Sequence, residues 1–170
     1  LPNTKGKTLV ADVSSCFLSE PVDVSKYGVI YGGVQKNVGP AGVVIAIIRE
    51  DLITDDVLEG TPTMLKYKTH ADAKSLYNTP PAYGIYICGK VFKWLKKQGG
   101  LEAIKERNEK KAKILYDYLD ESKLFKGTVV PKDRSLMNVP FITGNKELDA
   151  KFVKEAKEAG FENLKGHRSV

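Results

Sequence analysis

Three segments in the first fifty residues are almost continuously apolar, and they constrain the fold more than any other feature of the chain. They are KTLVADVS (7–14), YGVIYGGV (27–34) and GVVIAIIRE (42–50). Strands buried on both faces have this pattern and are typical of α/β layers, whereas strands with one solvated face alternate apolar and polar residues. We therefore expect an α/β fold in which these segments are strands of a sheet that is covered on both faces.

The links between these segments, SCFLSEPVDVSK and QKNVGPA, are short. A parallel crossover needs a dozen or more residues and usually contains a helix, and neither link has room for such a helix with its turns. The second link suits a hairpin-like reversal. The third strand is therefore expected to run antiparallel to the second, as a local exception in a mainly parallel sheet.

Residues 51 to about 80 are polar and lack hydrophobic periodicity, which in a compact domain usually marks a functional or partner-contacting segment. Pro80 and Pro81 then open a helix, because proline is tolerated in the first turn. Gly99 and Gly100 end that helix. Its predicted apolar stripe consists of Ile85, Cys88, Phe92 and Leu95.

The remaining residues predict a smaller α+β region. A second helix is expected from residue 101 to about 122, followed by a strand at 137–143 and a helix at about 147–159 that Gly160 closes. The inward residues of the second helix are predicted to be Ile104, Ala112, Leu115 and Leu119. We divide the chain into part of a large domain (1–80), connecting helices (81–122) and an incomplete small domain (123–170).

The net charge of +6 is concentrated in the second half, since residues 81–170 carry 19 basic against 12 acidic residues. A basic half can indicate nucleic-acid binding. Here lysine and glutamate alternate at helical i,i+4 spacing, as in Glu106/Lys110, and no basic run is interleaved with aromatic residues. We expect no nucleic-acid partner.

Two further classes of protein are not indicated. No run approaches the ~18 consecutive apolar residues of a membrane-spanning helix, so no membrane partner is expected. Cys16 and Cys88 are 72 residues apart without metal-ligand spacing, which predicts neither a disulfide framework nor a metal site. A reducing cytoplasm is the expected location.

Two charged residues stand at the ends of apolar segments, where isolated charges are unfavourable. Asp12 lies near the end of the first segment, and Lys36 of GGVQKN (32–37) follows the second. Residues that emerge from neighbouring strands can face a common ligand at the edge of an α/β sheet. A P-loop is excluded, because GxxxxGK[ST] is absent and Asn37 follows the lysine.

Pyridoxal phosphate chemistry uses such a pair in separate roles. A lysine with a lowered pKa can form an imine with the cofactor aldehyde. A carboxylate beside the pyridine nitrogen keeps that nitrogen protonated, so that the ring can accept electrons. From the residues alone, a buried salt bridge between Asp12 and Lys36 remains an alternative.

The residues that follow identify a family. The segment ADVSSCFLSEPVDVSKYGVIYGGVQKNVGPAGVVIAIIRE resembles the phosphoserine aminotransferase family, and so do YNTPPAYGIYICGKVFKWLKKQGG, RSLMNVPF and LKGHRSV in the same order. The resemblance extends over essentially all 170 residues. It implies the fold type I of pyridoxal-phosphate-dependent transferases, with part of the large-domain sheet and a smaller C-terminal α+β domain.

The resemblance also implies roles toward the cofactor, pyridoxal 5'-phosphate. Lys36 would be the Schiff-base lysine and would move the proton between the substrate α-carbon and the cofactor. Asp12 would pair with the pyridinium nitrogen. Gln35 would bind the cofactor phosphate, as would Asn78 and Thr79 from the neighbouring subunit of a homodimer with shared active sites. Local sequence alone also suits Asn78 or Thr79 as a helix N-cap.

The implied substrates are L-glutamate and 3-phosphohydroxypyruvate, which give 2-oxoglutarate and O-phospho-L-serine in serine biosynthesis. His167 and Arg168 would bind the substrate phosphate, for which the planar guanidinium fork is suited. His70 matches no motif position and is expected at the surface. Ser14 and Ser15 are expected to shape the turn after the first strand.

Parts of the family pattern have no counterpart in these residues. The aromatic residue that stacks on the cofactor ring and a Gly-Gly-x-Arg-Ala-Ser segment are missing, and Cys16 stands where Asn or Asp is expected. We therefore expect part of a longer or nicked polypeptide, inactive alone, with an exposed apolar sheet edge and face. The alternatives are a non-catalytic truncated relative that acts as a dimerisation or binding module, and another fold type I pyridoxal phosphate enzyme.

Overall fold

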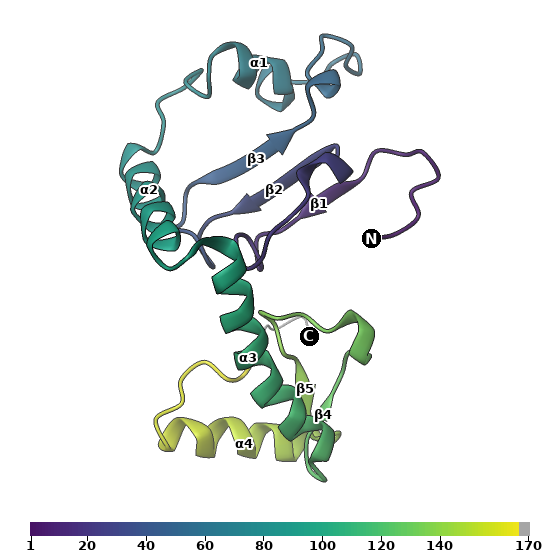
Figure 1. Ribbon diagram of the computed structural model, residues 1–170, viewed down its shortest axis with the longest axis vertical. Coiled ribbons are helices and arrows are strands. Elements are labelled where there is room, and N and C mark those ends of the chain that lie inside the picture. The colour runs from purple at the N-terminus through teal and green to yellow at the C-terminus, as the bar shows by residue number, and fades with distance from the viewer. Residues whose placement is uncertain (167–170) are drawn as a thin grey trace. The chain divides into compact units, whose positions relative to one another are not determined.

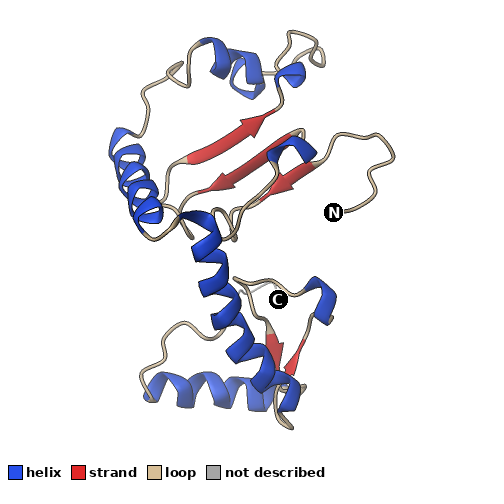
Figure 2. Ribbon diagram, viewed as in Figure 1, coloured by secondary structure: helices blue, strands red, loops and turns tan. Residues whose placement is uncertain are grey.

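The computed structural model describes residues 1–166 of the chain, which is organised as two compact units, 1–105 and 106–170. Figures 1 and 2 show the order of the elements along the chain. The strands and helices are β1 (Val10–Asp12), β2 (Val29–Gly33), β3 (Val44–Ile48), α1 (Tyr67–Asp72), α2 (Ala82–Lys97), α3 (Gly100–Glu121), β4 (Lys126–Gly127), β5 (Phe141–Ile142) and α4 (Lys146–Glu158). The predicted domain boundaries at residues 80 and 122 stay a prediction.

The three apolar segments form one sheet in the order β1-β2-β3. Strand β1 pairs with β2 in parallel, with Asp12 opposite Tyr31. Strand β3 pairs with β2 in antiparallel register, with Val44 opposite Gly33, so the predicted reversal is confirmed. The parallel connection between β1 and β2 contains a single 3₁₀ turn, Val24–Lys26, in place of a helix.

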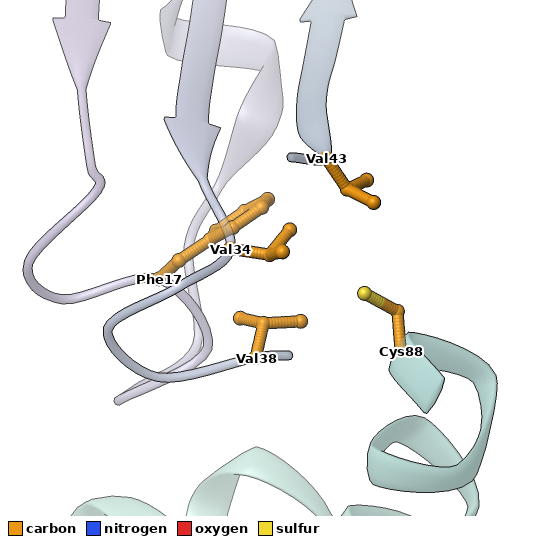
Figure 3. Close-up of a cluster of buried hydrophobic side chains, with 5 residues drawn as sticks. All are labelled: Phe17, Val34, Val38, Val43 and Cys88. Carbon is orange, nitrogen blue, oxygen red and sulfur yellow. The ribbon is translucent and has the colours of Figure 1, made fainter. Parts of the chain in front are cut away.

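The core of the first unit lies where the turn after β2 meets α2. Figure 3 shows the cluster, in which Cys88 of α2 points toward side chains from the ends of β2 and β3. Its buried members are Phe17, Val34, Val38, Val43 and Cys88. Each large apolar side chain in such a cluster stabilises the fold by about 1.5–3 kcal/mol relative to an exposed position. The cluster therefore fixes the turn that carries Lys36.

Coverage of both faces of the sheet is not observed within residues 1–166. The edge strands keep apolar side chains in solvent, with Val10 of β1 55% exposed and Val44 of β3 67% exposed. Helix α2 contributes Cys88 to the buried cluster beside the end of β2 and the start of β3. No described segment covers Val10 or Val44. The expected exposed apolar edge and face are confirmed.

The buried face of α2 differs from the predicted stripe. Cys88 and Leu95 are buried as predicted, but Ile85 and Phe92 are exposed and Gly84 is buried instead. The stripe shifts by one residue because the helix approaches β3 closely at Gly84, where a Cβ atom would lie 2.7 Å from Val43 Cγ2. Size rather than hydrophobicity selects the residue at this contact.

Both ends of α2 are defined by backbone geometry. The helix begins at Ala82 with Pro81 in the N-cap position and no side-chain cap, so the N-cap alternative for Asn78 or Thr79 is wrong. Gly99 adopts a φ of +98°, a conformation that glycine reaches at little cost, and it ends the helix as predicted.

The second unit has its own aromatic core. Phe125 packs edge-on against Phe141 and Phe152, with ring centroids 5.4 and 5.0 Å away. On α3, Ala112 and Leu119 are buried as predicted, but Leu115 is exposed and Tyr116 is buried, because its hydroxyl reaches the carbonyl of Ser135 at 2.9 Å. Buried tyrosines usually need such a partner.

The small sheet and the last helix complete this unit. The strand predicted at 137–143 is only Phe141–Ile142, and it pairs with β4, which the sequence pattern missed. The predicted helix at 147–159 is confirmed as α4. Asn145 caps it by accepting hydrogen bonds from the backbone amides of Glu147 and Leu148.

Residues 51–80 are less irregular than predicted, since they contain α1 and two 3₁₀ turns, Glu50–Leu52 and Thr63–Leu65. His70 of α1 is half-buried, and its Nε2 donates to the Met64 carbonyl at 2.8 Å. None of the helices in residues 1–166 combines the length and the apolar character that crossing a membrane requires.

Candidate active site

The sheet topology brings Asp12 and Lys36 to one edge. Asp12 is the last residue of β1, and Lys36 lies in the turn three residues after Gly33 ends β2. Because β1 and β2 are parallel, their carboxyl ends meet at the same edge, where α/β sheets place their ligands. The predicted juxtaposition of these two residues is therefore present.

Hydrogen bonds from Ser14 hold the Asp12 carboxylate. Asp12 Oδ1 accepts from the backbone amide of Ser14 at 2.9 Å and from its hydroxyl at 2.6 Å. The Ser14 bonds are the main cause that lowers the pKa of Asp12, with smaller contributions from the Tyr31 hydroxyl and the Lys36 charge. Asp12 is consequently ionised at neutral pH.

The end of β2 lies against the turn after β1. Ser14 Oγ accepts from the backbone amide of Gly33 at 3.0 Å, and Val13 donates its amide to the Tyr31 carbonyl at 2.8 Å. A Cβ atom on Gly32 would lie 3.2 Å from the Ser14 nitrogen, which is tighter than nine in ten real Cβ contacts. Glycine at position 32 therefore permits this close approach.

Lys36 is exposed, and its Nζ donates to Ser15 Oγ at 2.7 Å. Asp12 is exposed as well, and the two side chains form no ion pair in the part of the chain that the structure describes. The alternative of a buried salt bridge is therefore wrong. Lys36 is exposed because it lies beyond the end of β2, where the chain leaves the apolar layer.

The residues beside Lys36 differ in their contacts. Gln35 is exposed, and its side-chain amide lies against Gly33. Asn37 Nδ2 donates to the Phe17 carbonyl at 2.8 Å and so connects the turn after β2 with the turn after β1. Sequence reasoning assigned Asn37 no role, although its place beside the lysine in QKN was visible.

Of the other predicted site residues, Asn78 and Thr79 form no hydrogen bond with Asp12, Gln35 or Lys36 within residues 1–166. Asn78 and Thr79 are exposed, and the amide of Asn78 donates to the Thr79 carbonyl at 3.4 Å. Their predicted action from a neighbouring subunit stays a prediction. His167 and Arg168 lie outside the described residues.

The Cys16 thiol lies in the same turn as Ser14 and Ser15. Partial desolvation, followed by the negative charges of Glu20 and Asp12, raises the pKa of this thiol. The thiol is therefore kept protonated, which disfavours a nucleophilic role. Among residues 1–166, no cluster of three or more His, Cys, Asp or Glu residues could hold a metal ion.

Comparisons with known proteins identify the family of this chain. The aminotransferase class-V family model matches residues 2–170. A curated relative, phosphoserine aminotransferase of Nitrosomonas europaea, is 58% identical over 168 residues, which are 99% of this chain and 46% of that protein. The chain thus spans about half the length of the curated relatives it matches.

Two solved structures share the fold. A phosphoserine aminotransferase described for radiation damage of its Schiff base superposes with a TM-score of 0.92 at 49% identity, covering 100% of this chain and 47% of that one. The pyridoxal-phosphate-bound phosphoserine aminotransferase of Trichomonas vaginalis gives a TM-score of 0.92 at 36% identity, covering 100% and 48%. With a matching family model over nearly every residue, the chain belongs to the class-V aminotransferase family.

Proposed function

We propose that the chain supplies the lysine and the pyridine-binding carboxylate of a phosphoserine aminotransferase. The enzyme transfers an amino group between L-glutamate and 3-phosphohydroxypyruvate, giving 2-oxoglutarate and O-phospho-L-serine. One observation carries the proposal: an ionised Asp12 and an accessible Lys36 lie at the same edge of the parallel β1-β2 pair. The identity of 58% to a phosphoserine aminotransferase supports this choice of reaction.

The residues present fit pyridoxal phosphate. The amine of Lys36 rests on the neutral hydroxyl of Ser15 rather than on a carboxylate, so no ion pair must be broken before it reacts. The Asp12 carboxylate is exposed and held in its charged form by Ser14. When bound, this cofactor supplies an electron sink for the bond to the substrate α-carbon.

Each residue has a separate task. Asp12 would accept a hydrogen bond from the protonated pyridine nitrogen and would keep that proton in place. Lys36 takes and returns the proton at the substrate α-carbon, as a positioned general base. The exposed Gln35 amide would donate to the cofactor phosphate.

Further residues complete the site. We assign Asn78 and Thr79 to the cofactor phosphate of a second subunit in a cytoplasmic homodimer, since both side chains are exposed within a polar stretch. His167 and Arg168 are assigned to the substrate phosphate, because a guanidinium donates two parallel hydrogen bonds to such a group.

The test uses the full-length protein that carries this sequence. The protein is incubated with pyridoxal phosphate and reduced with borohydride, and its peptides are then analysed by mass spectrometry. We expect the adduct on Lys36. Lys36→Ala should abolish the adduct and lower turnover of O-phosphoserine by about 10²–10⁴-fold, the usual contribution of a general base.

The exposed Lys96 of α2 offers a matched control, since Lys96→Ala removes the same charge from the surface of the same unit. This variant should keep both the adduct and the turnover. An adduct that persists in Lys36→Ala contradicts the assignment of the lysine. An adduct on Lys36 without turnover of O-phosphoserine favours another enzyme of the same fold type, and a protein that binds no cofactor favours the non-catalytic module.

A further inference from the structure

We propose that Ser14 is a positioning residue for this reaction, which fixes the Asp12 carboxylate to the end of β2 and so sets its place relative to the turn that carries Lys36. The inference rests on the function proposed above, and it concerns a residue to which neither the motif pattern nor the cofactor chemistry assigned a catalytic task. Its basis is a chain of hydrogen bonds that joins three segments of the first unit.

The direction of this chain follows from the chemistry of the hydroxyl group. A serine hydroxyl has one hydrogen to donate and lone pairs to accept with. The backbone amide of Gly33 can only donate, so it occupies a lone pair of Ser14 Oγ at 3.0 Å. The hydroxyl hydrogen is then directed to Asp12 Oδ1 at 2.6 Å, and the carboxylate is tied to the β2 backbone.

The carboxylate needs such a restraint because its own strand holds it weakly. Strand β1 has only three residues, and the Asp12 side chain is exposed among residues 1–166. An exposed carboxylate can populate several rotamers, whereas a group that holds a cofactor must keep one orientation. The Ser14 amide and hydroxyl both bind Oδ1 and thereby restrict the rotation.

The same bond also relates the carboxylate to the lysine. Gly33 is the last residue of β2, and Lys36 follows it by three residues in a turn whose core side chains, Val34 and Val38, are fully buried. The Gly33–Ser14–Asp12 connection therefore starts from a fixed part of the backbone. Hydrogen bonds from residues that do not touch a cofactor orient the groups that do.

Electrostatics supports the assignment. The two hydrogen bonds from Ser14 are the largest causes that lower the pKa of Asp12, and they exceed the contribution of the Lys36 charge. A hydroxyl that donates to a carboxylate stabilises its ionised form. The ionised form is the one that can hold a protonated pyridine nitrogen.

The chain contains a matched control for these local contacts. Asp23 and Ser25 repeat the arrangement, with Asp23 Oδ1 accepting from the Ser25 amide at 3.1 Å and from its hydroxyl at 2.6 Å. Within residues 1–166, no backbone amide of another strand donates to the Ser25 hydroxyl. Ser25→Ala therefore removes the same local bond at a position without a connection to β2.

The experiment compares Ser14→Ala, Ser14→Thr and Ser25→Ala in the full-length protein. Without cofactor, NMR titration of the Asp12 carboxyl carbon should show a pKa that rises toward the ordinary 3.8 in Ser14→Ala. Ser14→Thr retains the hydroxyl and should keep the low pKa. Ser25→Ala should leave Asp12 unchanged. With cofactor, Ser14→Ala should weaken pyridoxal phosphate affinity about 10-fold, and Ser14→Thr should restore it.

The outcomes separate this inference from the proposed function. If the pKa of Asp12 is the same in Ser14→Ala and in the wild type, the inference is overturned, whatever the cofactor does. A loss of cofactor affinity that Ser14→Thr fails to restore overturns it as well. If Ser14→Ala raises the pKa of Asp12 as expected but the wild type forms no adduct on Lys36, the proposed function is overturned instead.

Discussion

The tripeptide Asp-Val-Ser occurs twice in the first unit, at 12–14 and at 23–25, with different outcomes. Its local geometry is the same in both places. The serine amide and hydroxyl both donate to one carboxylate oxygen, and these bonds are the largest causes that lower the pKa of the aspartate. Three residues are therefore sufficient to build an ionised carboxylate at the surface.

The difference lies in what surrounds each copy. Ser14 also accepts from Gly33 in β2, and the Lys36 charge acts on Asp12. Asp23 instead caps a 3₁₀ turn and pairs only loosely with Lys26, at 3.6 Å between two exposed side chains. The comparison shows that local sequence sets the charge of the carboxylate, whereas a contact across 19 residues makes one copy part of a site.

The largest effect should come from removing each carboxylate in turn. Asp12→Asn should lower O-phosphoserine turnover of the full-length protein by about 10²–10³-fold, because an electrostatic contact to the reacting system is lost. Asp23→Asn should leave turnover unchanged, since that carboxylate faces solvent beside Lys26. Steady-state kinetics with O-phosphoserine and 2-oxoglutarate measures both.

Asn keeps the shape of the side chain, so the two variants differ from the wild type mainly in charge. The far-ultraviolet circular dichroism spectra of both should match the wild type. Comparable losses of turnover in the two variants would show that the two Asp-Val-Ser copies do not differ in function.

Much of this site could be predicted from the pattern of apolar residues. Continuous apolar segments give strands, and a link of seven residues between two of them gives a reversal. Once β1 and β2 are parallel, residues that follow them must share an edge, which places Asp12 and Lys36 together. These inferences depend only on the order of the elements and tolerate errors of a few residues in their bounds.

The contacts that orient the site depend on register, which the pattern does not give. The Ser14–Gly33 bond exists because Asp12 lies opposite Tyr31, and a shift of one residue would remove it. The predicted buried faces of the helices were wrong for a related reason. Gly84 is buried rather than Ile85, because α2 approaches a neighbouring segment closely there, and Tyr116 is buried rather than Leu115, because a carbonyl is within reach of its hydroxyl. The glycine pair at 32–33 was the available signal for a close approach.

An intermediate effect, on stability, is expected from a side chain added at Gly32, where β2 approaches the turn after β1. In Gly32→Ala, the new methyl group would press on the backbone of Val13 and Ser14, which cannot move as a flexible side chain can. We expect a loss of about 1–3 kcal/mol in the free energy of unfolding, as for other overpacked positions. Urea denaturation followed by circular dichroism measures the change.

Gly89 of α2 is the matched control, because a Cβ atom there meets nothing within 4 Å. Gly89→Ala should stabilise the protein by about 0.5–1 kcal/mol, since alanine replaces glycine inside a helix. A Gly32→Ala variant as stable as the wild type would mean that β2 need not lie so close to the first Asp-Val-Ser copy.

The smallest effects are expected from removing the two serine hydroxyls. They should separate the local Asp–Ser hydrogen bonds from the bond between Ser14 and β2. Both aspartates have pKa values below the ordinary 3.8 in the folded chain. A carboxyl group whose pKa is lower in the folded than in the unfolded chain stabilises the fold at pH values above the unfolded pKa. This contribution is lost as the pH falls through the folded pKa. Ser14→Ala and Ser25→Ala should therefore both reduce the fall of the urea midpoint on acidification below 3.8, by similar amounts.

At neutral pH the two variants should differ. Ser14→Ala also leaves the Gly33 amide without its partner, which costs about 1 kcal/mol for a partly buried donor, whereas Ser25→Ala leaves no such group. The urea midpoint of Ser14→Ala should consequently be the lower one. Equal midpoints at neutral pH would show that the bond between β2 and Ser14 adds nothing to stability, and the two copies would then differ only in the charge of their neighbours.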